Sequence, residues 1–271
     1  MTTSPDRTRF RHLLTAEWIK LRSLRSTPWA LLVSALAIIG ANVSAAVADY
    51  TDFPSYPASM RADFLSSALF DSFTDLASQL VMLAAGSIGA IIIVSEFSTG
   101  LIRTTFAAVP NRRAVMGAKV IVLSAVMTGY GAIVSSISFV AVQAILAGRS
   151  ASAPVSDPHA MRVIVASTLL VPVCALTGLA VGSVVRHSAS SIVGTVVVLL
   201  LLPLLFVSKQ AWSAAIKRSL PHSAWYHLSA EQLAGPMNGI PTTNVGAWAV
   251  FAAWAVAAAA VAILAPNWRD V

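Results

Sequence analysis

The chain has 271 residues, of which 57% are hydrophobic and only 11% are charged, and its mean hydropathy is +0.77. Soluble domains carry about a quarter charged residues, so this composition excludes an ordinary soluble protein and predicts a membrane protein. The net charge of +7 does not indicate nucleic-acid binding, because no basic face interleaved with aromatic residues is present and membrane proteins carry Lys and Arg for topological reasons.

Residues 1–28 predict a basic amphipathic helix in front of the first membrane crossing. Apolar residues recur there at spacings of three or four, and Trp18 is a typical interfacial anchor. Such a helix can lie flat on the cytoplasmic leaflet, with its cations against anionic lipid. An N-terminal tail with accidental periodicity is the alternative. The apolar stripe consists of Phe10, Leu14, Trp18, Leu21 and Leu24, and the cations are Arg7, Arg9, Arg11, Lys20, Arg22 and Arg25.

Six apolar segments are long enough to cross roughly 30 Å of hydrocarbon. The first could be a cleavable signal peptide, but its apolar run is longer than the usual 7 to 15 or so residues, which favours a retained anchor. Six crossings return both termini to one side, and two thirds of the 18 Lys and Arg residues fall on that side, so we expect cytoplasmic termini. The expected crossings are residues 28–48, 76–94, 120–147, 163–185, 189–207 and 245–265.

The predicted fold is therefore all-α: a polytopic membrane protein with six transmembrane helices and no separate soluble domain. No crossing, within these limits, contains Asp, Glu, Lys, Arg or His, which argues against an ion-driven carrier or a voltage sensor. Pro172 and Pro203 are expected to bend the fourth and fifth helices. The expected parts are an interfacial helix (1–28), a membrane domain (29–265) with a cytoplasmic loop (95–119) and an external interfacial loop (208–244), and a cytoplasmic tail (266–271).

Residues 96–119, called the elbow below, form the most organised interruption of the apolar pattern. Ser98 or Thr99 can cap a short helix, and Pro110 stops that helix before a basic pair. The helix has an apolar face that could press on a partner, while its polar residues point elsewhere. The apolar residues are Leu101, Ile102, Phe106 and Val109, the polar ones Arg103 and Thr104, and the basic pair Arg112 and Arg113.

Energy for any pumping would have to come from another protein, because the chain contains no phosphate-binding loop. The elbow is the place where we expect that energy to enter. In the third crossing, a stripe of small residues follows one seam of the helix, which fits either close helix packing or the wall of a substrate path. The stripe consists of Ser124, Thr128, Gly131, Ser135 and Ser138. Asn42 and Gln143 could form hydrogen bonds between helices.

The loop before the last crossing predicts an interfacial helix around Trp212 and Ile216 that ends before Pro221. His227 and Glu231 are spaced four apart but lack a third partner, so they do not predict a metal site. Histidines beside Trp225 and Tyr226 are instead typical of a membrane surface. No arrangement of residues predicts catalysis, a metal or a cofactor.

Taken together, these features resemble the membrane subunits, or permeases, of bacterial ABC transporters of the type-2 export class, also called type V exporters. The resemblance covers nearly the whole chain and depends on the order and topology of short motifs. The matching residues are Glu17-Trp18-Ile19-Lys20-Leu21, Arg25-Ser26-Thr27, Ser95-Glu96-Phe97, Gly100, Arg103-Thr104-Thr105, Pro110, Arg113 and Lys119.

The resemblance implies a multi-pass permease in the bacterial cell membrane that exports a hydrophobic or amphipathic compound. Two permease copies, or a permease and a paralogue, would work with two separate ATPase subunits that use the ATP. The N-terminal helix would be a connecting helix, the last external loop would partly re-enter the bilayer, and the elbow would be the coupling helix. Coupling roles are thereby implied for Glu96, Gly100, Leu101, Ile102, Arg103, Phe106 and Arg113. The alternatives are a membrane anchor or sensor that binds a partner through the elbow, and, third, a secondary carrier.

Overall fold

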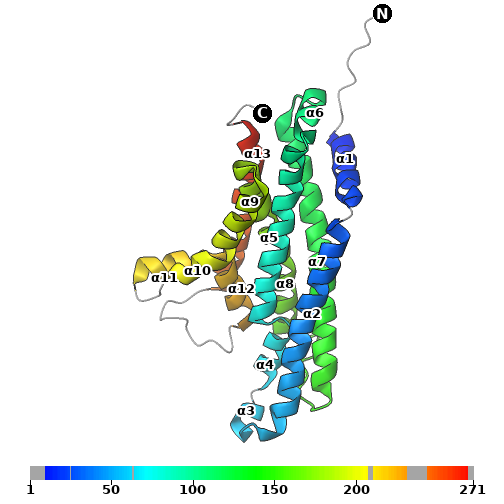
Figure 1. The fold of residues 1–271 in the computed structure, drawn as a ribbon. Helices are drawn as coiled ribbons and strands as arrows, with labels where there is room; N and C mark the ends of the chain where they lie inside the picture. Colours follow the sequence, from blue (N-terminus) through cyan, green and yellow to red (C-terminus); the bar gives the residue numbers. More distant parts are fainter. Residues whose placement is uncertain (1–9, 25, 63, 207–209, 231–242, 268–271) are drawn as a thin grey trace, which may run out of the picture.

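The computed structural model describes residues 10–24, 26–62, 64–206, 210–230 and 243–267. Every regular element within these residues is a helix, in agreement with the predicted all-α class. Six candidate spans are long and apolar enough to cross a membrane, as the sequence predicted. Figure 1 shows an elongated bundle whose long helices run roughly along one axis. These are α2 (Ser26–Asp52), α5 (Asp75–Ser98), α7 (Arg112–Ala147), α8 (Pro158–Val185) and α13 (Asn244–Leu264).

Shorter helices connect and flank the long ones. The segment between the first two predicted crossings, residues 49–75, contains two of them, α3 and α4. The shorter helices are α1 (Phe10–Ser23), α3 (Ala58–Ala62), α4 (Phe64–Asp71), α6 (Leu101–Ala108), α9 (Ser188–Val196), α10 (Leu202–Leu205), α11 (Ala211–Arg218) and α12 (Pro221–Ala230).

Helices α5 and α8 form the centre of the bundle and approach each other most closely. A Cβ atom at Gly89 would lie 1.9 Å from the carbonyl oxygen of Ala175, and one at Gly178 would lie 1.9 Å from that of Gly86. Glycine allows this approach because it has no side chain, which is a common device for packing helices in membranes. The two backbones are therefore in direct contact.

The fifth predicted crossing is not one continuous α-helix. Helix α9 packs against α5 and α8, and the chain then passes through a π-helical segment, Val197–Leu201, into α10. Pro203 in α10 has no N–H to donate to the carbonyl of Leu199, so the regular helix is interrupted where the sequence predicted a bend. Figure 1 shows α10 and α11 projecting sideways from the bundle.

At the elbow, helices α5 and α7 extend beyond the crossings predicted from composition. Helix α5 continues to Ser98, and α7 begins at Arg112, eight residues before the predicted start at Val120. The second crossing was predicted to end before Glu96 and the third to begin after Lys119, because both residues are charged. Glu96 and Lys119 lie instead inside these helices, where their side chains pair with each other.

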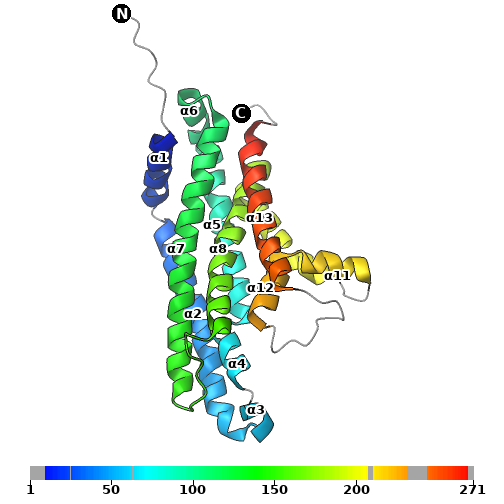
Figure 2. The same ribbon diagram turned by 180° about the vertical axis from the view of Figure 1, so that it is seen from behind.

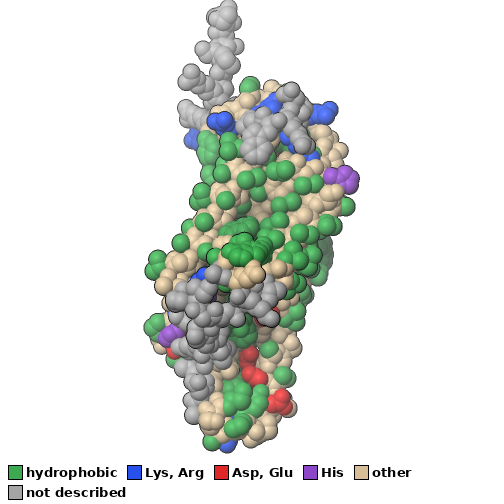
Figure 3. Space-filling model, turned by 90° about the vertical axis from the view of Figure 1, so that its left-hand side faces the viewer, with side chains coloured by type: hydrophobic (Ala, Val, Ile, Leu, Met, Phe, Trp, Pro, Cys, Tyr) green, Lys and Arg blue, Asp and Glu red, His purple; other side chains and the backbone are tan. Residues whose placement is uncertain are grey.

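The two ends of the bundle differ in charge. The described start of α1, helix α6 and the end of α13 lie at one end, and α3 lies at the other (Figures 1 and 2). On the face drawn in Figure 3, Lys and Arg side chains gather at the α6 end, while carboxylates lie toward the α3 end and apolar side chains cover the middle. This is the charge distribution expected of a helical bundle placed across a bilayer.

Candidate functional site: a buried ion cluster at the elbow

Helix α6 starts at a sharp reversal of the chain after α5. Gly100 has φ +72°, a left-handed conformation that glycine adopts without strain, and it directly precedes the first residue of α6. The prediction that Ser98 or Thr99 caps α6 was wrong: both hydroxyls donate to the carbonyl of Ser95 in the last turn of α5. The end of α6 agrees with the prediction, because the helix stops at Ala108 before Pro110.

The two faces of α6 have different surroundings. Ile102 and Phe106 are buried at 1% and 8% exposure and pack into the core of the same chain. Leu101 is 42% exposed, and Arg103 and Thr104 are also exposed. The predicted apolar face is therefore divided: most of it packs back onto the bundle, and the surface left for another protein combines an aliphatic residue with a cation.

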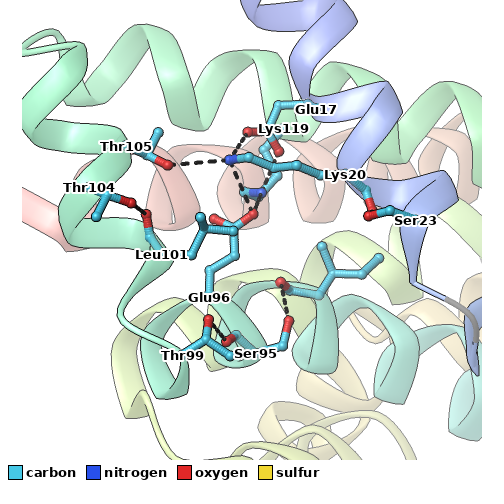
Figure 4. A network of polar contacts seen from close by, with 11 residues as sticks. Glu17, Lys20, Ser23, Ser95, Glu96, Thr99, Leu101, Thr104, Thr105 and Lys119 are labelled. Atoms are coloured by element: carbon cyan, nitrogen blue, oxygen red, sulfur yellow. Dashed lines mark hydrogen bonds and ion pairs between the residues drawn. The ribbon is translucent and has the colours of Figure 1, made fainter.

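Four charged side chains meet behind α6 and form what we call the elbow cluster: Glu17, Lys20, Glu96 and Lys119. Lys119 Nζ lies 2.7 Å from Glu96 Oε1 and also donates to Glu17 Oε2. Lys20 Nζ lies 2.8 Å from Glu17 Oε1 and 3.4 Å from Glu96 Oε1. Figure 4 shows these contacts joining α1, α5 and α7.

The elbow cluster is electrically balanced and largely removed from solvent. Glu17, Glu96 and Lys119 are 5%, 6% and 3% exposed. Isolated charges at this depth are very unfavourable, so their pairing is a condition for the packing of the three helices. Burial lowers the pKa of Lys20, but the hydrogen bond to Glu17 and the charges of Glu96 and Glu17 outweigh it and raise that pKa above its usual value. Lys20 is therefore a cation at neutral pH.

The elbow cluster also contacts α6 itself. Lys20 Nζ lies 3.5 Å from Thr105 Oγ1, on the side of α6 that faces the bundle. At the next residue of α6, the centre of the Phe106 ring lies 5.4 Å from the guanidinium of Arg112 at the start of α7, where Asn111 caps α7 by accepting from the N–H of Ala114 at 3.1 Å. Helix α6 is thus connected to α1 and α7 through two neighbouring residues.

Two arginines attach the end of α13 to the same region. Arg112 Nη1 donates to the carbonyl of Pro266 at 3.3 Å, and Arg186 Nη2 lies 3.5 Å from the carbonyl oxygen of Ala265. Arg186 also lies 5.0 Å from the centre of the Phe97 ring at the end of α5. Arg113, the other member of the predicted basic pair, is exposed.

The polar residues of the third crossing take part in packing within one chain. Ser135 and Ser138 are buried, Ser124 and Thr128 are half-buried, and a Cβ at Gly131 would meet the backbone of α8 at 2.6 Å. The predicted interhelical hydrogen bonds are confirmed. Asn42 donates to Ser138 Oγ and accepts from the N–H and hydroxyl of Thr74, and Gln143 donates to the carbonyl of Ala68 and to Ser72 Oγ.

Helix α1 packs against α7 along part of its apolar stripe. Leu14, Leu21 and Leu24 pack on the core, whereas Phe10 and Trp18 are 43% and 44% exposed. The protein itself therefore covers some of the surface that the sequence suggested for lipid. The last residue of the motif Glu17-Trp18-Ile19-Lys20-Leu21 lies in this packed face, and the predicted cations Arg7, Arg9 and Arg25 lie outside the described residues.

The prediction that the aromatic residues now seen in α12 lie at a membrane surface is wrong for Trp225. Trp225 is fully buried, and its Nε1 donates to Ser167 Oγ in α8 at 3.0 Å. His222 Nε2 lies 2.8 Å from Asp75 Oδ1 at the start of α5. Glu231 lies outside the described residues, and no group of three or more metal-binding side chains occurs within them. The exposed Trp212 and Ile216 lie on α11, as predicted.

Sequence reasoning missed that Glu17 and Lys20 belong to the site. A signal for Glu17 was present, because it lies three residues after Leu14 and four before Leu21, on the stripe that packs inward. An acidic residue on an apolar helix face requires a partner, and the partner is Lys119, 102 residues away. The sequence matches no protein-family model and no curated protein.

Proposed function

We propose that the chain is the permease subunit of an ATP-driven bacterial ABC exporter and moves a hydrophobic or amphipathic compound out of the cell. The observation that carries this proposal is the construction of the elbow: a short helix with an exposed cationic and aliphatic side, joined through a buried ion cluster to three longer helices. Such an element can receive a displacement from a separate ATPase and pass it to the membrane helices.

The path of that displacement follows the contacts of α6. Ile102 and Phe106 transmit motion to the core because interiors are closely packed. Gly100 and Asn111 allow α6 to meet α5 and α7 at defined angles. In this mechanism Leu101, Arg103 and Arg113 contact the ATPase, whereas Glu96 acts from behind by holding α5 to α7 and α1. In this mechanism ATP is bound and used by the partner subunit.

The proposed orientation puts the α6 end in the cytoplasm of a bacterial cell. It is supported by the gathering of Lys and Arg at that end, since cytoplasmic segments of membrane proteins carry excess positive charge. Exposed apolar residues such as Trp29 on α2 and Val256 on α13 would face lipid or a second permease copy. A cavity of about 380 Å³ between α8 and α13, lined almost entirely by apolar residues, is compatible with a hydrophobic compound.

The experiment compares charge reversals at the two ends of the bundle. The chain is reconstituted into liposomes with a P-loop ATPase encoded beside it, and ATP-dependent accumulation of the lipophilic dye rhodamine 6G is measured. Arg103→Glu is expected to reduce accumulation about tenfold, because an interface arginine often dominates binding. Arg61→Glu is the matched control: Arg61 is also exposed on a short helix, but at the opposite end, and its reversal should leave transport unchanged.

Equal transport by both variants would refute the coupling role of α6. ATP-dependent movement of the dye would exclude the anchor or sensor hypothesis. Binding of an ATPase without movement of any compound, or the absence of an encoded ATPase partner, would instead favour that hypothesis. Dye movement driven by a proton or sodium gradient without ATP would indicate a secondary carrier.

A further inference from the structure

Helices α1 and α7 form an apolar groove of about 350 Å³ on the outer side of the bundle, where α1 lies beside the first half of α7 (Figure 2). Trp18, Ile121 and Ala125 in its walls are exposed, so a ligand can reach the groove from outside. The elbow mechanism does not use it. The α1 wall consists of Leu14, Thr15 and Trp18, and the α7 wall of Ile121, Val122, Ala125 and Val126.

The groove is continuous with an uncovered face of α7. Gly129, Ala132 and Ser136 follow Ala125 at spacings of three and four residues and are all exposed, and a Cβ atom at Gly129 would meet no atom within 4 Å. Helix α7 is one of the six candidate membrane spans, so lipid chains can lie along such a face. An acyl chain against α7 can therefore extend into the groove without leaving apolar surface.

Two arginines lie on the same face of α1 as the groove. Arg11 and Arg22 lie four residues before Thr15 and four after Trp18, and this spacing places all four side chains on one side of the helix. Both arginines are exposed, and the Arg22 guanidinium lies 5.9 Å from the centre of the Trp18 ring. The cationic group of Arg22 is therefore at the edge of the groove.

Neither helix offers these arginines a carboxylate. Glu17 is the only acidic residue of α1, and its two oxygens contact Lys20 and Lys119 of the elbow cluster. Helix α7 contains no acidic residue. The groove thus combines apolar walls with positive charge that neither of its helices neutralises. Its chemical complement is an anionic molecule with an alkyl chain.

We propose that the groove binds one anionic phospholipid of the surrounding membrane, with an acyl chain against Trp18 and Ile121 and the headgroup phosphate at Arg22. The volume lies at the lower end of the roughly 300–1,000 Å³ of sites for drug-sized ligands, which suits a single alkyl chain. Arginine suits the phosphate because its planar guanidinium can donate two parallel hydrogen bonds. Arg11, about 16 Å away along the helix, adds to the positive potential that attracts the headgroup. A bound lipid would hold α1 on α7 and thereby support the elbow cluster.

The test counts the lipids bound to the full chain in detergent micelles by native mass spectrometry. Dioleoyl phosphatidylglycerol and dioleoyl phosphatidylcholine are compared, because they have the same acyl chains and differ in headgroup charge. We expect one phosphatidylglycerol per chain to bind saturably and at least about fivefold more tightly than phosphatidylcholine. That factor corresponds to the contribution of about 1 kcal/mol from one cation at an anionic surface. Glycerol 3-phosphate, which has the phosphate but no chains, should bind far more weakly than either lipid.

Arg22→Gln removes the charge at the edge of the groove and should lower the affinity for phosphatidylglycerol to that for phosphatidylcholine. Arg149→Gln is its matched control. Arg149 is also exposed and lies 4.5 Å from the centre of the Tyr50 ring, but it follows the far end of α7 and is not part of the groove. This substitution should leave the affinity for phosphatidylglycerol unchanged.

A second pair of variants tests the apolar wall without changing a charge. Ala125→Leu fills part of the groove and should weaken saturable phosphatidylglycerol binding at least about fivefold. Ala132→Leu is its control, because Ala132 is exposed on the same face of α7 two turns further along and outside the groove.

Three results would overturn the proposal: equal affinity for the two lipids, unchanged binding by Arg22→Gln or Ala125→Leu, or glycerol 3-phosphate binding as tight as that of the lipid. A dimer of the chain that forms without bound lipid and is lost in Ala125→Leu would also overturn it, and would assign the groove to a second copy. All these measurements use the chain alone and without ATP, so a negative result would leave the proposed exporter function untouched.

Discussion

Removing Lys119 from the elbow cluster tests how the elbow is held. Lys119→Met deletes the ammonium that contacts both carboxylates and keeps a side chain of similar shape. Glu17 and Glu96, which are 5% and 6% exposed, would then have only Lys20 to balance them, and its side chain is 25% exposed. Breaking a buried ion pair by removing one partner costs about 3–5 kcal/mol. We expect the free energy of unfolding to fall by about that amount.

A second substitution separates lost charge balance from lost packing. In Lys119→Met/Glu17→Met, the remaining Glu96 and Lys20 still form a pair at 3.4 Å, so the cluster is neutral again. The double variant should recover at least about 2 kcal/mol relative to the sum of the single changes, because apolar replacements for a buried ion pair are often nearly neutral. The assay is SDS-induced unfolding in mixed micelles, followed by tryptophan fluorescence. A single variant as stable as the natural chain, or strictly additive single effects, would refute this account.

Two other features give predictions of their own. Gly89→Ala should disrupt the contact between α5 and α8, because its Cβ would lie 1.9 Å from a carbonyl oxygen, whereas Gly40→Ala has no atom within 4 Å and should be neutral or stabilising by up to about 1 kcal/mol in the same unfolding assay. The hydrogen bond from Tyr56 to Asp49 raises the pKa of the phenol to about 12, so the stability it supplies is complete below the unfolded pKa of about 10 and is lost as pH rises through the folded value. A near-ultraviolet absorbance titration should show this late phenol, and Asp49→Ala should return it to the ordinary range; an unchanged titration would contradict the assignment.

The membrane-spanning character of the chain was predictable because it depends on length and composition alone. The ends of the helices were not. Charge normally marks the limit of a crossing, but Glu96 and Lys119 neutralise each other within the bundle, so α5 and α7 continue past them. Local backbone chemistry was partly readable: Pro110 ends α6 as expected, whereas the role of Gly100 depends on a left-handed conformation that the sequence did not assign.

The members of the site were only partly predictable because its contacts join distant parts of the chain. Glu96 could be singled out in the elbow, but its partners in α1 and α7 come together only through tertiary packing. Trp225 is a second example, in which a residue expected at the surface is buried by tertiary packing. Its position in a polar loop suggested a membrane surface, but α12 folds against α8 and places the indole in the core, where its N–H has a partner.

The glycine contacts between α5 and α8 also determine which parts of the bundle can move independently. Where Gly89 and Gly178 bring two backbones together, there is no layer of side chains that could slide or change rotamer. We therefore expect α5 and α8 to move together. Relative motion would occur around this pair, at the interfaces of α1, α2 and α13, whose faces interlock through side chains and polar bridges. We therefore expect a tilt at the α6 end to move the surrounding helices relative to this pair rather than to separate α5 from α8.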